Sequence, residues 1–276
     1  MEFGIATFVT DESIRPDRLG PAVEERGFDS LFVTEHSHIP ASRETPFPGG
    51  GDLPRRYYRT LDPFVALTAA AAHTSRILVG TGIALIPQRD VLHLAKEVAS
   101  LDLVSNGRAV LGVGSGWNRE EMRNHGADPK TRGALTNERL AALKQLWTEE
   151  RAEFHGEFVD FDPVFSWPKP VQRPHPPIYV GGETAPALER LLHHGDAWFP
   201  RVGTPLARIR EVREWLAERG RPDVPVTLFG TERDVAALNG YAEAGLDRVT
   251  FLLSTKPEAE ALTELDSFAE LAQKIR

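Results

Sequence analysis

Residues 77–117 constrain the fold more than any other stretch, because two apolar strand patterns there enclose one helical pattern. Residues 77–86 are apolar apart from a Gly-Thr-Gly interruption, and residues 109–113 are apolar apart from one glycine. Such nearly continuous apolar runs are typical of parallel strands that are buried on both faces. Residues 91–104 place apolar side chains three or four positions apart, as in a helix packed on a sheet, and Asn106-Gly107 predicts its end. The segment therefore predicts one β-α-β unit of a parallel sheet.

The same alternation continues on both sides of this unit. Strand patterns, each followed by a helical pattern, begin near residues 3, 30, 77, 109, 178, 197, 226 and 249. Such a series predicts an α/β protein whose strands close a (β/α)8 TIM barrel, and it favours this fold over an open doubly wound sheet. We expect a single domain over residues 1–276, with excursions from the repeat at residues 41–60 and 151–177. Residues 41–60 predict an irregular binding loop, and residues 155–161 alternate like a short exposed strand.

The composition excludes several kinds of site and partner. The sequence has no cysteine, which excludes disulfides, thiolate metal sites, iron–sulfur clusters and a cysteine nucleophile. A net charge of −8 without a basic stripe argues against nucleic acid as a partner. No apolar run approaches the roughly 18 residues of a membrane span, and the first residues lack the pattern of a secretory signal. We therefore expect a soluble cytoplasmic protein without a membrane partner.

Candidate site residues follow several of the predicted strands, and in a barrel such residues share one rim. Glu35 and His36 follow the second strand, where an imidazole can donate a hydrogen bond or a proton. Glycines at three further strand ends allow a ligand to approach the backbone, and the last group opens a helix whose amides suit a phosphate. These glycine-bearing candidates are Gly82, the run Gly112 to Gly116, and Gly181-Gly182 with Thr184. Each has a simpler explanation in packing or turns, but together they predict a flat, phosphate-bearing cofactor held by backbone.

Three stretches of the sequence resemble a known family. TEHSHIP, VGTGIALIPQRDVLHLAKEVASLDLVSNGRAVLGVGSGWNREEM and PPIYVGGETAPALERLLHHGDAWFP are similar to the bacterial luciferase-like superfamily of flavin- and deazaflavin-dependent oxidoreductases. The resemblance covers most of the chain and implies a (β/α)8 barrel that binds FMN or coenzyme F420, an 8-hydroxy-5-deazaflavin, at the carboxyl end of its strands. It also implies a non-prolyl cis peptide at Gly82-Ile83 behind the deazaflavin ring.

The resemblance further assigns roles to single residues. His36 matches a histidine beside the reactive face of the ring, and we expect Glu35 to orient it. The loop along the cofactor is matched by Gly114, Ser115 and Gly116, and the phosphate-binding turn by Gly181, Gly182 and Thr184.

Two departures limit what the resemblance implies. Trp117 stands where the sugar-phosphate dehydrogenase branch has an acidic proton donor, which argues against that activity and predicts that Trp117 walls a substrate pocket. Only a few residues separate the seventh strand, ending near Gly230, from the helix at Asp234, where luciferase and the alkane-sulfonate monooxygenases carry a long insertion. An open site favours hydride transfer between F420 and a small organic substrate over an FMN-dependent monooxygenase, which remains the alternative.

Two function classes outside this family also remain. His36-Ser37-His38 is an HxH pair that could share a zinc ion in a metal-dependent hydrolase, although no series of carboxylates accompanies it. A protein that binds the cofactor without catalysis is the other class. The resemblance, with the apolar helical patterns at residues 62–73 and 91–104, also predicts a homodimer.

Overall fold

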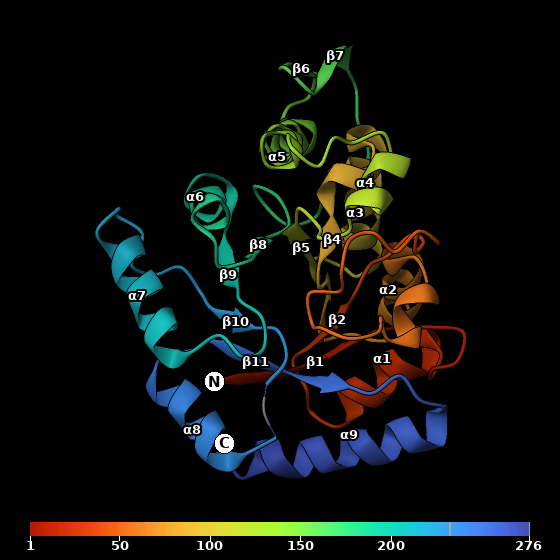
Figure 1. Ribbon diagram of the computed structural model, residues 1–276, viewed down its shortest axis with the longest axis vertical. Helices are drawn as coiled ribbons and strands as arrows, with labels where there is room; N and C mark the ends of the chain where they lie inside the picture. Colours follow the sequence, from red (N-terminus) through yellow and green to blue (C-terminus); the bar gives the residue numbers. More distant parts are fainter. Residues whose placement is uncertain (232, 276) are drawn as a thin grey trace.

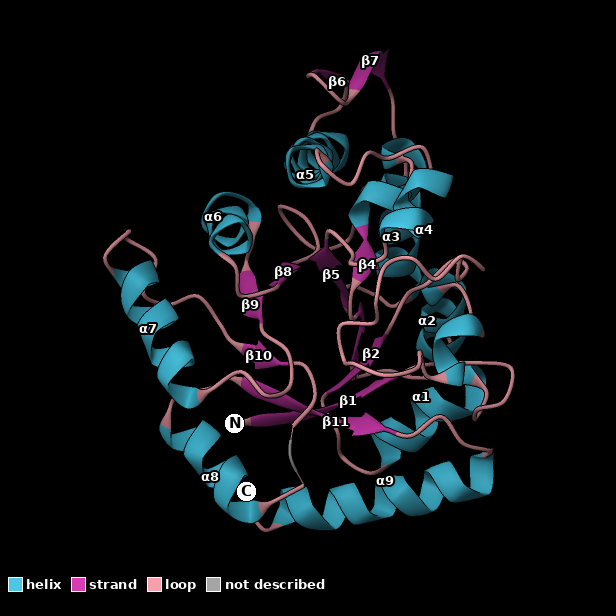
Figure 2. Cartoon of the chain, viewed as in Figure 1, coloured by secondary structure: helices cyan, strands magenta, loops and turns pink. Residues whose placement is uncertain are grey.

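A parallel sheet rolled into a barrel, with helices around it, organises the computed structural model, which describes residues 1–231 and 233–275 (Figures 1 and 2). The hydrogen-bonded order of the barrel strands is β10-β11-β1-β2-β3-β5-β8-β9, and β4 pairs with β5. Two parallel bridges, Trp198 to Val226 and Arg201 to Phe229, complete the ring between β9 and β10. The predicted (β/α)8 barrel is therefore confirmed.

The barrel strands begin close to the positions predicted from the sequence. They are β1 (Glu2–Thr7), β2 (Ser30–Val33), β3 (Leu78–Thr81) with β4 (Ala84–Leu85), β5 (Ala109–Gly114), β8 (Ile178–Gly181), β9 (Ala197–Phe199), β10 (Thr227–Leu228) and β11 (Arg248–Leu253).

A helix follows each barrel strand and covers the outside of the ring. These helices are α1 (Pro16–Glu25), α2 (Pro63–Ala71), α3 (Val91–Val104), α5 (Arg132–Thr148), α6 (Ala185–His194), α7 (Leu206–Ala217), α8 (Val235–Glu243) and α9 (Glu258–Gln273). The predicted stop after α3 is confirmed, because Asn106 and Gly107 have φ of 55° and 79°, values that end a helix. No described helix is long and apolar enough to cross a membrane.

The connections contain more regular structure than the sequence predicts. Residues 41–60 include the short 3-10 helix η1 (Arg55–Tyr58), and the polar segment after β5 contains α4 (Arg119–Asn124). The single exposed strand expected at residues 155–161 is wrong, because the chain reverses there between antiparallel β6 (Ala152–His155) and β7 (Asp160–Val164). The Glu138 carboxylate on α5 causes the reversal by accepting hydrogen bonds from three successive amides, those of residues 157–159, at 2.8–3.0 Å. Figure 1 shows this hairpin projecting beyond α5.

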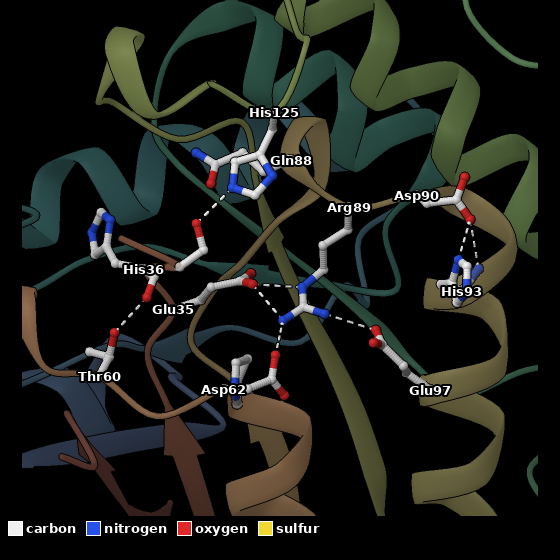
Figure 3. A pocket seen from close by; sticks show the side chains of 12 residues that line it. Glu35, His36, Thr60, Asp62, Gln88, Arg89, Asp90, His93, Glu97 and His125 are labelled. Atoms are coloured by element: carbon white, nitrogen blue, oxygen red, sulfur yellow. Dashed lines mark hydrogen bonds and ion pairs between the residues drawn. The ribbon is translucent and has the colours of Figure 1, made fainter. Parts of the chain in front are cut away.

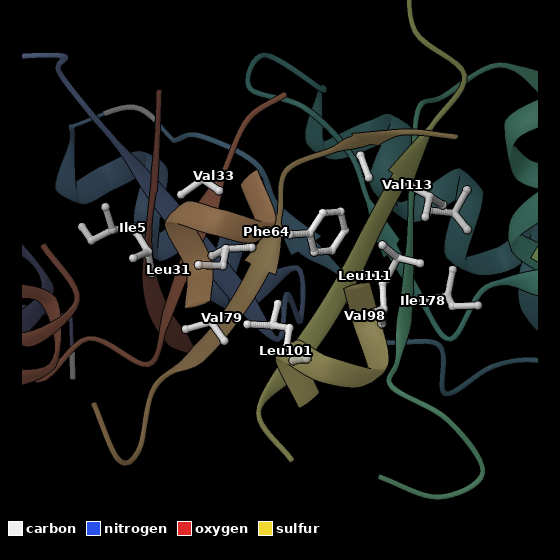
Figure 4. Packing of buried hydrophobic residues seen from close by; sticks show 14 of the residues in the cluster. Ile5, Leu31, Val33, Phe64, Val79, Val98, Leu101, Leu111, Val113 and Ile178 are labelled. Carbon is white, nitrogen blue, oxygen red and sulfur yellow. The ribbon is translucent and has the colours of Figure 1, made fainter. Parts of the chain in front are cut away.

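The core has two layers because successive strand side chains point to opposite faces. Figure 4 shows Ile5, Leu31 and Val79 on neighbouring strands, on the side that packs against α2 and α3. The inward-facing cluster is smaller and consists of Ala6, Phe32, Val110, Tyr179, Ala197 and Phe199. Gly80 makes room for it, since a Cβ there would lie 2.7 Å from the Phe32 ring. The barrel is thus filled by side chains, and a ligand site must lie at its mouth.

Candidate functional site

His36 follows β2 at the carboxyl end of the barrel, and its side chain is almost fully buried. Its Nδ1 lies 2.8 Å from Oε2 of Glu121, and Oε1 of the same carboxylate accepts a hydrogen bond from Ser37 N at 3.2 Å. Glu121 lies on α4 and is fully buried. A carboxylate accepts hydrogen bonds, so His36 Nδ1 carries the donated proton. The other ring nitrogen, Nε2, bonds no other described residue and is available to a ligand.

Glu35 does not orient His36, and this expectation from the sequence is corrected. Glu35 and the His36 ring point to different sides of the segment after β2 (Figure 3). The Glu35 carboxylate instead accepts hydrogen bonds from Leu85 N and Arg89 Nε, each at 2.6 Å. Glu35 therefore fixes the loop after β3, and Glu121 positions His36.

Arg89 lies on the wall of a pocket of about 370 Å³, away from the His36 ring (Figure 3). It also bonds Asp62 at 2.6 Å and Glu97 at 2.8 Å. Burial alone would lower the pKa of Arg89, but the charge and hydrogen bond of Glu35 and the bond to Asp62 raise it above its usual value. Carboxylates therefore hold one buried guanidinium in the wall of this pocket, which His36 also lines.

An aromatic wall surrounds the His36 ring. Trp117 meets it edge-on at a centroid distance of 5.8 Å, and Tyr57 of η1 lies at 5.3 Å. Phe47 packs against both of these rings, at 6.0 Å from Trp117 and 5.2 Å from Tyr57. His36 and Trp117, which were candidates from the sequence, are therefore neighbours, and two residues of the 41–60 loop complete the wall.

Helix α4 holds the 41–60 loop over this wall. Thr45 donates two hydrogen bonds to Glu120, from Oγ1 at 2.8 Å and from its amide at 3.2 Å. Burial acts against ionisation of Glu120, but the bonds from Thr45 outweigh it and lower the pKa of the carboxyl. Arg43 lies over the Trp117 ring, 5.9 Å from its centroid. One short helix thus positions both His36, through Glu121, and the loop above it.

Glycines of two other strands meet the end of β3. The Gly82-Ile83 peptide is cis, as the resemblance implied. A Cβ at Gly114 would lie 1.9 Å from Ile83 Cδ1, and a Cβ at Gly181 would lie 3.2 Å from Ile83 Cγ2. The absence of side chains at these glycines therefore accommodates Ile83, and candidates from β3, β5 and β8 come together. Ser115 is turned toward α5, where its hydroxyl lies 3.1 Å from that of Thr136.

The turn before α6 has the features of an anion site. Gly182 has φ of 106°, which a side chain would disfavour, and Thr184 is the N-cap of α6 without a side-chain capping bond. Pro186 has no amide hydrogen, and the Ala187 amide donates to the Thr184 carbonyl at 2.9 Å, so Ala185 supplies the free amide of the first turn of α6. Arg201 and Arg208 approach the same turn through the carboxylate and carbonyl of Glu183, at 3.6 Å and 3.2 Å. A free amide at a helix N-terminus and nearby guanidinium groups suit a phosphate.

The HxH pair is divided between two sets of contacts. His36 pairs with Glu121, whereas His38 contacts Ser37 Oγ and Asn124 Nδ2, each at 2.8 Å. Within residues 1–231 and 233–275, no group of three or more His, Asp or Glu side chains could hold a metal ion. The described side chains therefore offer no support for a metal-dependent hydrolase.

Glu121, Tyr57 and Phe47 are site residues that no motif in the sequence singled out. A signal for Glu121 was present, because Asn118-Arg-Glu-Glu121 has the spacing of a helix-capping box. In the structure Asn118 Oδ1 accepts from Glu121 N at 3.3 Å, as an N-cap should, but the Glu121 carboxylate bonds His36 and Ser37. The capping pattern therefore locates α4 and leaves the role of Glu121 undetermined.

Comparisons with known sequences agree with this arrangement. The sequence matches the model of the luciferase-like monooxygenase family over residues 16–274. An uncharacterised protein of Mycobacterium tuberculosis is 38% identical over 279 residues, with 98% of both chains covered. An FMNH2-dependent dimethylsulfone monooxygenase of Pseudomonas putida is 29% identical over 168 residues, which cover 60% of this chain and 46% of that enzyme.

Solved structures share the fold over the full length of the chain. The monooxygenase RslO1 from Streptomyces bottropensis superposes with a TM-score of 0.80 at 21% identity, covering 99% of each chain. An F420-dependent secondary alcohol dehydrogenase superposes with a TM-score of 0.76 at 17% identity, covering 100% of each chain.

Proposed function

The chain belongs to the luciferase-like monooxygenase family, and from this premise we propose that it is an oxidoreductase that transfers a hydride between coenzyme F420 and a small organic substrate. The observation that carries the proposal is the set of three features around one barrel mouth. These are the Gly82–Ile83 segment between β3 and β4, the His36–Glu121 pair and the turn before α6.

The residues present fit a flat cofactor with a phosphate group. The Ala185 amide at the start of α6 has no side-chain acceptor, and Gly182 has a backbone that favours glycine, so the phosphate would lie at Gly181, Gly182 and Thr184. Gly82 and Ile83 would support the ring, and the backbone of Gly114, Ser115 and Gly116 would pass along its edge. When bound, a deazaflavin supplies a ring carbon that gives or accepts a hydride.

The chain itself contributes orientation and proton handling. Glu121 accepts the Nδ1 proton of His36 and so fixes the direction of Nε2 toward the substrate's polar group. With a proton on Nδ1 alone, Nε2 accepts a hydrogen bond or a proton; once the ring carries both protons, Nε2 donates one to that group. General acid catalysis of this kind typically contributes a factor of about 10² to 10⁴ in rate. Trp117, Tyr57 and the 41–60 loop exclude water from the reacting groups.

One structural relative and one short connection favour F420 over FMN. An F420-dependent secondary alcohol dehydrogenase shares the fold over 100% of each chain. The connection between β10 and α8 is also short, with Leu228 and Val235 as its flanking residues. A site without a long insertion there is more open, which suits hydride transfer better than oxygen activation.

An FMN-dependent monooxygenase is the second candidate, and the full-length similarity to the monooxygenase RslO1 favours it. Titration of the purified protein with F420 and with FMN separates the two, followed by turnover assays that monitor the absorbance of the oxidised ring. We expect tighter binding of F420 and a change in its ring absorbance with an alcohol or carbonyl substrate. Tighter binding of FMN with oxygen consumption would contradict the proposal, and binding without any ring redox change would indicate a non-catalytic protein.

We further propose that the protein is a homodimer formed through α2 and α3. Several large apolar side chains of these helices are exposed, and solvation of such a surface is unfavourable. They are Val65, with 66% of its surface exposed, and Leu92, Leu103 and Val104. Light scattering that gives the monomer mass at micromolar concentration would contradict this assembly.

A further inference from the structure

A second cavity, of about 270 Å³, opens between the ends of β1, β10 and β11 and the 41–60 loop. Its apolar lining includes Phe8, Leu252 and Leu253. Its polar lining includes Arg56, Ser254 and Arg233, and the Arg233 guanidinium pairs with Glu264. One wall of the cavity can thus accept an apolar chain while a guanidinium faces the same space.

Arg56 differs from the arginines beside it on η1. Arg55 pairs with Glu12 at 2.6 Å and Arg59 pairs with Asp11 and Glu12. No described carboxylate lies within ion-pair distance of Arg56, and its buried Nε has no hydrogen-bond partner in the described part of the chain. In a protein with a net charge of −8, an arginine turned inward without a carboxylate is a site for an anion.

Aromatic rings hold the Arg56 guanidinium in place. Its Cζ lies 5.0 Å from the Phe8 ring centroid and 5.7 Å from that of Tyr57. A guanidinium held by rings loses little side-chain entropy when it binds a carboxylate, and its planar fork can donate two parallel hydrogen bonds.

One aromatic residue separates the cavity from His36. Tyr57 packs against Phe8 at 4.6 Å and against His36 at 5.3 Å. A ligand whose anionic end pairs with Arg56 therefore reaches the His36 ring by passing the Tyr57 side chain.

We propose that the substrate is a small organic anion whose carboxylate pairs with Arg56 and whose apolar part lies against Phe8, Leu252 and Leu253. This rests on the proposed function in one respect, namely that the reacting end of the substrate lies near His36. Arg56 is then the residue that determines specificity, because a neutral analogue would leave its half-buried guanidinium without a counter-charge.

The test measures binding and needs no turnover. Hexanoate and hexanamide are the probes, with isothermal titration calorimetry of the protein before and after loading with F420 or FMN. The wild type should bind hexanoate about 10- to 100-fold more tightly than hexanamide, the range expected for a charge-assisted hydrogen bond. Arg56→Gln should remove this preference, and Arg56→Lys should keep part of it.

Arg55→Gln is the matched control, because it removes the same charge from the same short helix on the side that pairs with Glu12. It should leave the preference for hexanoate unchanged. Equal losses in the Arg55 and Arg56 variants, no preference for hexanoate, or no binding of either probe would overturn the proposal.

The cofactor has anionic groups of its own, so its binding is measured in the same variants. If Arg56→Gln weakens cofactor binding and leaves hexanoate binding unchanged, the anion held by Arg56 belongs to the cofactor and the proposal is wrong. Failure of F420 to react would contradict the proposed function alone, because the binding preference of Arg56 does not depend on hydride transfer.

Discussion

Replacement of His36 should affect stability as well as turnover, and the two effects can be separated with His36→Ala and His36→Asn. The Glu121 carboxylate is fully buried and accepts hydrogen bonds from His36 Nδ1 at 2.8 Å and from Ser37 N at 3.2 Å. Alanine leaves this buried carboxylate with one donor, and removing a hydrogen-bond partner from a buried group costs about 1–3 kcal/mol. Asparagine can place its amide nitrogen near the position of Nδ1 and keep the bond.

Both variants lose the ring that packs against Trp117 and Tyr57, so their difference isolates the hydrogen bond to Glu121. A hydrogen bond to a charged group contributes about 1.5–3 kcal/mol, and His36→Asn should be more stable than His36→Ala by that amount. The assay is urea unfolding followed by circular dichroism, with cofactor titration and turnover on the same samples. Both variants should turn over slowly, because neither has an Nε2.

A double-mutant cycle with Glu121→Gln checks the physical cause. If the two side chains stabilise each other, the effects of His36→Ala and Glu121→Gln should fail to add by about 0.5–3 kcal/mol. Additive effects, or equal urea midpoints for His36→Ala and His36→Asn, would refute the role assigned to Glu121.

Three further predictions concern other parts of the chain. Gly112→Ala should destabilise the barrel by about 1–3 kcal/mol, because its Cβ would lie 2.0 Å from the backbone oxygen of Thr81, and an unchanged melting temperature would contradict this. Burial, followed by nearby positive charges, lowers the pKa of His194 from 6.5 to about 4, so the folded protein loses stability as the pH falls from 6.5 toward 4. The His194→Gln variant has no such group and should lose less stability than the wild type over this range, by at most about 3 kcal/mol. Urea midpoints at each pH would measure the difference. Val65→Asp should convert the dimer to a monomer in light scattering, whereas Val235→Asp, on α8, should leave it intact.

The barrel was predictable because each of its strands and helices carries its own periodic signal. Helix α3 spans Val91–Val104, as its apolar spacing predicts, and a buried parallel strand lies on each side of it. The β6–β7 hairpin was not predictable in the same way. Its turn depends on Glu138, nearly twenty positions earlier in the sequence, whose carboxylate collects three backbone amides. A local alternation of apolar and polar residues cannot reveal such a contact.

The glycines at the strand ends predict close contacts without identifying the residues that make them. Glycines at the ends of β5 and β8 predict that something approaches the backbone closely. The structure identifies the neighbour of Gly114 and Gly181 as Ile83, which a Cβ at either position would crowd. These contacts form only when the fold brings β3, β5 and β8 together. The sequence therefore predicts that the glycines lie at the mouth of the barrel, but it does not predict that they contact Ile83.

For helix α4 the sequence predicts where the helix begins but not which residues its carboxylates bind. Its sequence, REEMRN, contains one apolar residue, Met122, and a periodic pattern cannot be recognised in so short a polar segment. The capping spacing of Asn118 and Glu121 predicts a helix start. It cannot predict that Glu121 and Glu120 bind His36 and Thr45, because both of these residues lie in the connection between β2 and η1, far earlier in the chain.

The positions of Glu35 and His36 show why neighbours in sequence are poor candidates for partners in a site. In an extended segment successive side chains point to opposite sides, so a carboxylate directly before a histidine is the one least able to reach its ring. Glu35 accordingly binds Arg89 on the far side, while Glu121, 85 positions later, binds His36 Nδ1. His36 and Glu121 therefore come from different β-α units, and a loop that carries only one of them cannot orient the His36 ring. This division makes the site depend on closure of the barrel, and a variant that loosens α4 should lose turnover before it unfolds.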